Sequence, residues 1–429
     1  MAMIAFSVLI FNVPADDAHA AGRLTTESDA RRLGLKRAWF TQVRLDPARN
    51  HVERAVLVGD RLSVLTTAGV LQEINALTGE TVWTAPIGNP DYPSLGPAVS
   101  ERHVALLNGS TLYVLDRADG RPVIARQVGG APGAAPALSR EHAFVPLLTG
   151  RIEGYPLGEQ TLTPWYYQSF GRATVAPLAT PESIVWATDS GHLYVGRVGD
   201  LGVRYRLETA SEFVAPPAYH KPYVYAATLS GEVFAMHEST GARRWRYSTG
   251  FPVTRAPAAL KELVFVTSEE PMLHCVDALH GAALWEAPKI AQFAALSRDR
   301  VYGVDDLGGL VVLDAKTGAL LGRMPTDITT NALVNDQTDR IYLISADGMV
   351  QCLHEAGAKE PLYHKPVATP EQPVTTEEAA PSSEATATES PPDTAEETAP
   401  AEEVPEETEM PAEENPFGGE TEDDNPFDF

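Results

Sequence analysis

The chain has 429 residues, 44% of them hydrophobic, and a formal net charge of -25 at pH 7. The negative charge is concentrated at the C-terminal end: residues 366–429 contain 20 Asp and Glu and no Lys or Arg, so residues 1–365 carry only -5. A mildly acidic body argues against nucleic acid as a partner, because such binding is driven by basic surface. With only Cys275 and Cys352, the chain has neither a disulfide framework nor a CxxC metal or redox motif.

The N-terminus contains an apolar stretch at residues 3–11, which is too short to span a bilayer. Ala18-His19-Ala20 fits a small-x-small cleavage site, so we expect residues 1–20 to be a signal peptide for export to the periplasm or cell envelope. The stretch lacks a basic n-region, and the alternative is an apolar leader that stays on the protein. Neither cysteine follows it, so no lipoprotein anchor is expected. Residues 21–34 form a further leader, whose charged part, 25–34, is the one segment with helical character.

From residue 35 to 365 the sequence repeats with a period near 40 residues, which is typical of a repeat architecture. Eight apolar segments follow short turns such as TTAG, LNGS and TLSG, and each is preceded by a second short apolar run, which predicts β-hairpins. The intervals between the eight segments are 41, 40, 41, 40, 40, 37 and 40 residues. The segments are anchored at Leu71, Leu112, Ile152, Leu193, Val233, Leu273, Leu310 and Val350.

Each hairpin is flanked by two further elements. Upstream lies a segment of small residues with Ala or Pro, as in GPAVS, VAPLAT and RAPAALK, and downstream several units have a turn followed by a large residue, often Trp. Four strands in about 40 residues are the content of one propeller blade. The sequence therefore predicts an all-β fold, an eight-bladed β-propeller of four-stranded antiparallel blades.

The ring must be closed by a strand from one chain end. Residues 35–41, LKRAWFT, parallel residues 241–247, GARRWRY, which form the last strand of a unit. We expect this N-terminal strand to complete the blade built around Val350, closing the ring and removing exposed sheet edges. The alternative is that residues 360–364 fill that place.

The best copies of the repeat share a glycine, an aliphatic run, Asp-Ala-x-Thr-Gly or a close variant, and then a large residue, as in GEVFAMHESTGARRW from Gly231. This pattern resembles the repeat of the pyrroloquinoline-quinone-like (PQQ-like) propeller family, which includes propellers of outer-membrane assembly. The resemblance implies that the tryptophans stack between blades as docking residues and do not form a ligand platform. The residues concerned are Trp83, Trp245, Trp285, Gly79, Gly241, Gly281 and Gly318.

Quinone-dependent dehydrogenases are the catalytic relatives that the resemblance implies, and they need a cysteine pair against the quinone, calcium ligands and an aspartate base. The chain has no adjacent cysteines. Asp305-Asp306 and residues 335–339 offer carboxylates to calcium, but acidic residues are also common in turns for backbone reasons, and we favour that interpretation. His237, His274 and His354 fall at similar repeat positions, and there is no HExxH motif. No catalytic, cofactor-binding or metal residue is predicted, and neither PQQ nor calcium is expected.

Residues 366–429 form an acidic tail rich in Glu and Thr with 11 prolines. Such a composition buries too little apolar surface to offset chain entropy, so we expect disorder. Two motifs, Asn415-Pro416-Phe417 and Asn425-Pro426-Phe427, place a large apolar side chain on this tail. Two such motifs could dock onto a multivalent partner. The alternative is a tail that only solubilises the protein.

The sequence thus favours a non-enzymatic scaffold in the bacterial cell envelope that binds other envelope proteins through propeller loops, and in addition through the tail if its motifs dock. We expect a monomer without a transmembrane span. The alternative is an enzyme, either a quinone-dependent dehydrogenase or a hydrolase with its site over the central channel.

Overall fold

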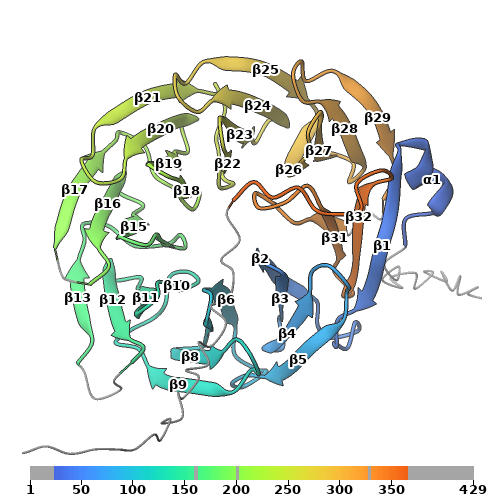
Figure 1. Cartoon of the computed structure of the whole chain (residues 1–429). Coiled ribbons are helices and arrows are strands. Elements are labelled where there is room, and N and C mark those ends of the chain that lie inside the picture. Colours follow the sequence, from blue (N-terminus) through green and yellow to red (C-terminus); the bar gives the residue numbers. More distant parts are fainter. Residues whose placement is uncertain (1–23, 159–162, 200–201, 327–329, 366–429) are drawn as a thin grey trace, which may run out of the picture. The chain divides into compact units, whose positions relative to one another are not determined.

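A computed structural model describes residues 24–158, 163–199, 202–326 and 330–365. The chain divides into two compact units, Met1–Pro370 and Glu371–Phe429, and the described residues all belong to the first. They form a ring of eight four-stranded antiparallel sheets around a central channel (Figure 1). The prediction of an all-β, eight-bladed propeller is therefore confirmed.

In each blade the strand nearest the channel comes first, and the outermost comes last, except in the closing blade (Figure 1). The first four blades are β2 (Val52–Val58), β3 (Arg61–Thr66), β4 (Val70–Asn75), β5 (Thr81–Pro86); β6 (Ser94–Val99), β7 (His103–Asn108), β8 (Thr111–Asp116), β9 (Pro122–Gln127); β10 (Ala137–Leu138), β11 (His142–Pro146), β12 (Arg151–Pro156), β13 (Trp165–Gln168); and β14 (Leu178–Ala179), β15 (Ser183–Ala187), β16 (His192–Arg197), β17 (Val203–Glu208). The next three are β18 (Ala218–His220), β19 (Tyr223–Ala227), β20 (Glu232–His237), β21 (Arg243–Ser248); β22 (Ala258–Leu260), β23 (Leu263–Ser268), β24 (Met272–Asp277), β25 (Ala283–Pro288); and β26 (Ile290–Leu296), β27 (Arg300–Asp305), β28 (Leu310–Asp314), β29 (Leu320–Met324).

The middle strands of the blades are apolar along nearly their whole length because neighbouring blades cover both of their faces. Leu65 and Leu71 of the first blade are fully buried in one cluster with Val104 and Leu106 of the second. Each of the eight anchor residues is likewise fully buried. Burial of both faces explains why the sequence shows continuous apolar runs here in place of alternation.

The eighth blade closes the ring with strands from both ends of the described chain. It contains β30 (Thr330–Ala332), β31 (Ile341–Ser345), β32 (Met349–Glu355) and, outermost, β1 (Leu35–Gln42), which pairs antiparallel with β32. The predicted N-terminal closure is confirmed. The alternative was wrong: Tyr363, within 360–364, forms an isolated bridge with Thr338.

A short helix precedes the closing strand, within the segment that had shown helical character. α1 (Glu27–Arg32) begins after Thr26, whose side chain caps it by accepting a hydrogen bond from the Asp29 amide at 3.1 Å. Leu33, just after the helix, packs on the core shared by the seventh and eighth blades, and its carbonyl accepts a bond from Arg300 at 2.9 Å. The helix and the residue after it therefore help to hold the closing strand β1 against the ring.

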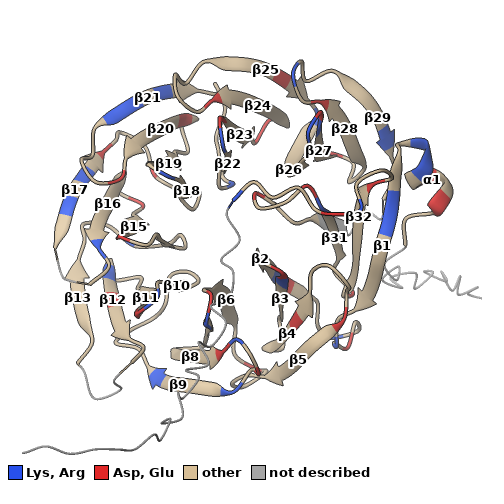
Figure 2. Cartoon of the chain, in the orientation of Figure 1, with Lys and Arg blue, Asp and Glu red and all other residues tan. Residues whose placement is uncertain are grey.

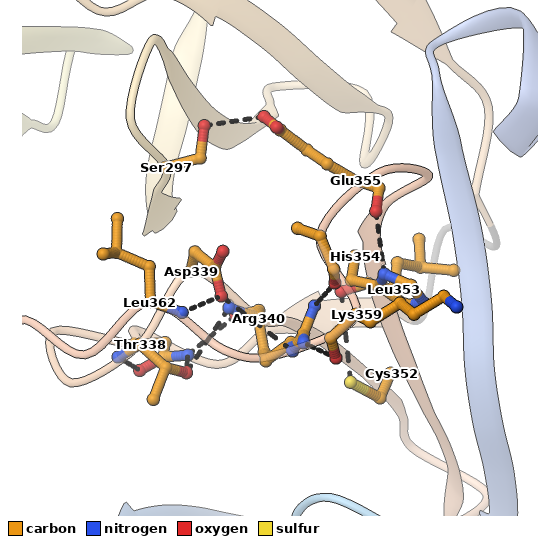
Figure 3. A network of polar contacts seen from close by, with 12 residues as sticks. Ser297, Thr338, Asp339, Arg340, Cys352, Leu353, His354, Glu355, Lys359 and Leu362 are labelled. Atoms are coloured by element: carbon orange, nitrogen blue, oxygen red, sulfur yellow. Dashed lines mark hydrogen bonds and ion pairs between the residues drawn. The ribbon is translucent and has the colours of Figure 1, made fainter.

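Polar contacts hold the segment after β32 against the same blade (Figure 3). The Arg340 guanidinium is buried and donates to the carbonyls of Ala358 and Lys359 at 2.9 and 2.7 Å. The Asp339 carboxylate accepts from the Leu362 amide at 3.1 Å, and burial raises the pKa of Asp339. The segment thus covers the end of the closing blade.

Because strands alternate in direction, the loops divide between the two ends of the ring. The connections between blades and the turns between second and third strands lie at one end, which we name the connection face. The two other turns of each blade lie at the opposite end, the turn face. Backbone bonds between neighbouring loops support this division: on the connection face the Leu229 amide donates to Glu212 at 2.9 Å, and on the turn face the Ala278 amide donates to Glu262 at 2.9 Å.

At five blade interfaces a large outer-strand side chain bonds to a backbone carbonyl of the following blade on the turn face. The ring lies against a glycine there, and a Cβ at Gly79, with φ +79°, would be 2.6 Å from the Trp39 ring. The donors and carbonyls are Trp39 with Ala76, Trp83 with Arg117, Tyr205 with His237, Trp245 with Ala278 and Trp285 with Ala315, at 2.8 to 3.1 Å. The matching glycines are Gly79, Gly120, Gly241, Gly281 and Gly318.

This set contains all seven residues singled out in the sequence and three more: Trp39, Tyr205 and Gly120. Trp39 stands at the same place as Trp245 in the two aligned segments, and this signal could have identified it. Tyr205 replaces tryptophan in a unit without the motif, so no pattern marked it.

Candidate protein-binding face

The connection face exposes large apolar side chains at its loop tips. Phe170, between the third and fourth blades, is 68% exposed, Tyr92, between the first and second, is 56% exposed, and Leu307, in a turn of the seventh, is 66% exposed. Exposed aromatic residues at loop ends are a feature of surfaces that bind other proteins. Among the described residues, the large apolar side chains exposed on this face are Tyr92, Leu148, Phe170, Leu229, Phe251 and Leu307.

Local contacts hold these tips in place. The Phe170 amide donates to the Tyr194 hydroxyl at 3.0 Å, and its ring meets the His192 imidazole edge-on at a centroid distance of 5.4 Å. Tyr92 lies beside the turn at Gly109, whose amide donates to the Pro93 carbonyl at 2.9 Å. An exposed side chain that is already positioned loses less conformational freedom when a partner covers it.

The turn face has a different surface. Its first-to-second-strand turns carry exposed pairs of opposite charge, namely Glu101-Arg102, Arg140-Glu141, Lys261-Glu262 and Arg298-Asp299. Its exposed large apolar residues are Leu77, Leu279, Val334 and Tyr363. Blue segments, which mark Lys and Arg, lie on outer strands such as β17 and β21 (Figure 2). Aromatic loop tips are therefore concentrated on the connection face, where Tyr92, Phe170 and Phe251 lie, against Tyr363 alone on the described turn face.

A cavity of about 960 Å³ occupies the centre of the ring. Its walls are mostly the small-residue segments noted in the sequence, including Pro97, Pro136, Pro177, Pro217 and Pro257. Proline and alanine leave the channel open because they project little into it. Proline also removes backbone donors from the inner strands, which discourages another strand from pairing there.

A second cavity, of about 230 Å³, lies where the second and third blades meet without a tryptophan–glycine contact. Here the Glu153 carboxylate accepts from the Gly129 amide at 3.0 Å and from the Tyr155 hydroxyl at 2.6 Å. Burial, followed by the bond to Glu153, raises the pKa of Tyr155. The Trp165 ring packs on Gly154 of its own blade, and its indole nitrogen has no hydrogen-bond partner among the described residues.

Ser268, His274 and Glu286 have the order of a hydrolytic triad, which the sequence did not reveal. His274 Nε2 lies 3.4 Å from the Ser268 hydroxyl, and its Nδ1 lies 3.2 Å from the Glu286 carboxylate. However, the Ser268 hydroxyl donates to the Glu270 carbonyl at 2.7 Å, and Ser268 and His274 are buried and line neither cavity. Burial lowers the pKa of His274, with Glu286 opposing it. The group supports a hairpin turn and offers no accessible nucleophile.

The acidic residues considered for calcium have other partners. Asp305 is buried, forms an ion pair with Arg323 and accepts from the Gly309 amide at 2.7 Å. Asp336 forms an ion pair with Lys365. Within the described ranges no group of three or more His, Cys, Asp or Glu is placed to hold a metal ion. Cys275 and Cys352 are buried and do not form a disulfide.

Two sets of sequence predictions lie outside the described residues: the signal peptide at 1–20, and the tail at 366–429 with Asn415, Pro416, Phe417, Asn425, Pro426 and Phe427. In the part of the chain that the structure describes, no helix is long and apolar enough to cross a membrane.

Ring size, repeat pattern and tryptophan–glycine contacts together define an eight-bladed propeller of the PQQ-like class. A family model described as "Outer membrane protein assembly factor BamB" matches residues 67–199 and 171–384, so the chain belongs to the BamB family.

Known proteins similar to this chain agree with that assignment. The outer membrane protein assembly factor BamB of Burkholderia pseudomallei is 24% identical over an alignment of 282 residues that covers 62% of this chain and 64% of the relative. The chain thus spans somewhat less than two thirds of that relative's length.

Solved structures share the fold. The crystal structure of BamB from Moraxella catarrhalis has a TM-score of 0.60 at 18% identity, covering 75% of this chain and 97% of that one. The computationally designed Ika8 protein gives 0.58 at 16% identity, covering 71% and 96%. The C-terminal WD40 domain of Sif2 gives 0.57 at 9% identity, covering 75% and 98%.

Proposed function

We propose that this protein is a non-enzymatic scaffold of outer-membrane protein assembly in the bacterial envelope and that it binds a protein partner through its connection face. The observation that carries the proposal is the set of exposed, locally positioned apolar residues on that face, led by Tyr92, Phe170 and Phe251. Family membership supplies the process, because the matched relatives are named as outer membrane protein assembly factors.

The chemistry of the face supports protein binding. Interface hot spots are enriched in large aromatic side chains, each of which removes much apolar surface from water when a partner covers it. The chain has no adjacent cysteines, which the quinone-dependent relatives need, so we propose that it acts without PQQ or calcium. The proposed location is the periplasm or envelope, reached through the signal peptide predicted at residues 1–20.

The test is complementation of a strain that lacks the chromosomal gene. The full chain, a Phe170→Ala/Phe251→Ala variant and a Leu77→Ala/Leu279→Ala control from the turn face are expressed at equal level. The readout is the amount of folded outer-membrane β-barrel protein, measured by its heat-modifiable migration in gels. We expect the full chain and the control to restore it and the connection-face variant to fall short. No restoration by the full chain would refute the assembly role.

We propose that the Asn-Pro-Phe motifs of the tail add a second contact. A chain ended at Lys365 should then retain partner capture but with a faster release. An unchanged rate of partner dissociation would mean that the tail only solubilises the protein.

A further inference from the structure

The charged side chains that line the central channel are three basic and two acidic, namely Arg54, Arg255 and Lys365 against Glu53 and Asp336. Arg54 is the third residue of β2, the innermost strand of the first blade, and Arg255 lies in the connection just before β22 of the sixth. Both line the 960 Å³ cavity. Since β2 and β22 each begin at the connection face, both arginines lie toward that mouth of the channel.

Other polar groups line the wall as well, and among them Glu53 lies next to Arg54 in β2. Lys365 and Asp336 neutralise each other as an ion pair, and the Gln292 amide donates to the Ala332 carbonyl at 2.6 Å. Neither Arg54 nor Arg255 makes a hydrogen bond or ion pair with any other described residue. Both side chains are exposed within the channel, where each offers five donors and a permanent charge to a ligand.

The surroundings of Arg54 make an anion more favourable there. Water reaches this side chain, but the channel walls replace much of the bulk solvent around it. This burial lowers the pKa of Arg54, and the adjacent Glu53 only partly opposes it. A reduced dielectric strengthens attraction to an incoming negative charge.

We propose that the central channel binds an acidic peptide segment. Arg54 and Arg255, which belong to different blades, bind carboxylates of this segment. Guanidinium groups pair with carboxylates through two parallel hydrogen bonds. The cavity lies at the upper end of the range for drug-sized ligands, roughly 300–1,000 Å³, which suits several residues better than a single small acid. Prolines in the wall limit strand pairing, so recognition falls to side-chain charge. This site is independent of the apolar loop tips in the proposed function.

The experiment uses fluorescein-labelled tetraglutamate and the full chain, with binding followed by fluorescence anisotropy at low and high salt. Variants are Arg54→Gln, Arg255→Gln and the double replacement. The matched control is Arg298→Gln, an exposed arginine on the turn face. Thermal unfolding of each variant checks the fold, and Arg54→Lys tests whether charge without the guanidinium fork suffices. Unlabelled glutarate and tetralysine serve as competitors.

We expect salt-sensitive binding that weakens about tenfold with each single replacement and is lost in the double variant, with Arg298→Gln unchanged. Glutarate should compete only at far higher concentration, and tetralysine should not compete. No binding of tetraglutamate, or equal binding by the double variant, would overturn the site. Equal competition by glutarate would overturn the peptide assignment. Loss of partner capture by Phe170→Ala/Phe251→Ala with tetraglutamate binding intact would separate this site from the loop tips.

Discussion

The two ends of the ring are built from the same repeat but have different surfaces. On the turn face, large aromatic side chains point at glycines of the next blade and bond to its backbone, as Trp39 does at Gly79. On the connection face, aromatic side chains such as Phe170 and Phe251 point outward and are exposed. The difference teaches that aromatic side chains join neighbouring blades on the turn face, whereas on the connection face they are exposed, where we propose that a partner binds.

A buried ion pair on the turn face stabilises the contact between two blades. Arg117 binds the Glu73 carboxylate at 3.0 Å and donates to the Val58 and Ser100 carbonyls at 2.6 and 3.2 Å, linking the first two blades. Removing one partner of such a pair leaves an uncompensated buried charge. The predictions that follow run from the largest expected effect to the smallest.

Arg117→Ala should lower the free energy of unfolding by about 3–5 kcal/mol, because Glu73 would remain buried without its cation. Denaturant unfolding of the purified protein measures the change. The matched control is Arg121→Ala in the same turn. Because the ion pair of Arg121 with Asp119 is exposed, this replacement should lower the free energy of unfolding by less than about 0.5 kcal/mol. Equal effects of the two replacements would contradict the stabilising role of the turn face.

Gly79→Ala should cost about 3 kcal/mol, since the new Cβ meets the Trp39 ring at 2.6 Å in addition to the strain of a positive φ. Gly250 on the connection face has the same φ of +79° with nothing within 4 Å of an added Cβ. Gly250→Ala therefore carries the strain alone and should cost about 1 kcal/mol. Thermal unfolding of the two variants measures the difference. Similar losses of stability would show that the contact between Gly79 and Trp39 does not stabilise the protein.

Acidification should weaken the turn face through His364. Its Nε2 donates to the Leu296 carbonyl at 2.7 Å, while its buried Nδ1 has no hydrogen-bond partner within the part of the chain that the structure describes. Burial lowers the pKa of His364 below its ordinary value, despite nearby Asp336 and Asp339. The unfolded chain then binds the proton more readily, so stability present above the ordinary histidine pKa is lost as pH falls below it. Denaturant midpoints at pH 7.5 and 5.5 should differ less in His364→Gln; an unchanged difference would contradict this role.

Phe170→Ala/Phe251→Ala should alter the free energy of unfolding least, by about 0.5 kcal/mol or less, because both side chains lie at exposed loop positions outside the core. The same denaturant unfolding measures it. A loss as large as that of Gly79→Ala would mean that these residues stabilise the ring. It would contradict the proposal that their role is to bind a partner.

The repeat pattern was sufficient for the architecture. Eight anchors in register predicted eight blades, and the match between residues 35–41 and 241–247 predicted the closing strand, because equivalent strands pack in equivalent ways. Four of the five docking glycines followed from the family pattern, and Gly120 did not. These features depend on local sequence that recurs, so they can be read from the chain alone.

The candidate site could not be predicted in this way, because exposure at a loop tip depends on neighbouring loops. Leu147 and Leu148 are adjacent in one turn, yet the first is 1% exposed and the second 41%. Phe213 and Phe251 both lie in connections between blades, but Phe213 is fully buried and Phe251 is not. Similarly, Arg54 and Arg255 are far apart in the sequence, and only the closure of the ring brings both to the wall of the central channel.

The most direct test of the central claim is site-specific photo-crosslinking in the native envelope. A photoreactive phenylalanine analogue is placed at Phe170 or Phe251 on the connection face and, as matched controls, at Leu77 or Leu279 on the turn face, with crosslinked proteins identified by mass spectrometry. The account predicts that a protein of the outer-membrane assembly machinery is captured from the first pair and not from the second. Capture from the turn-face positions alone, or equally from both faces, would contradict it.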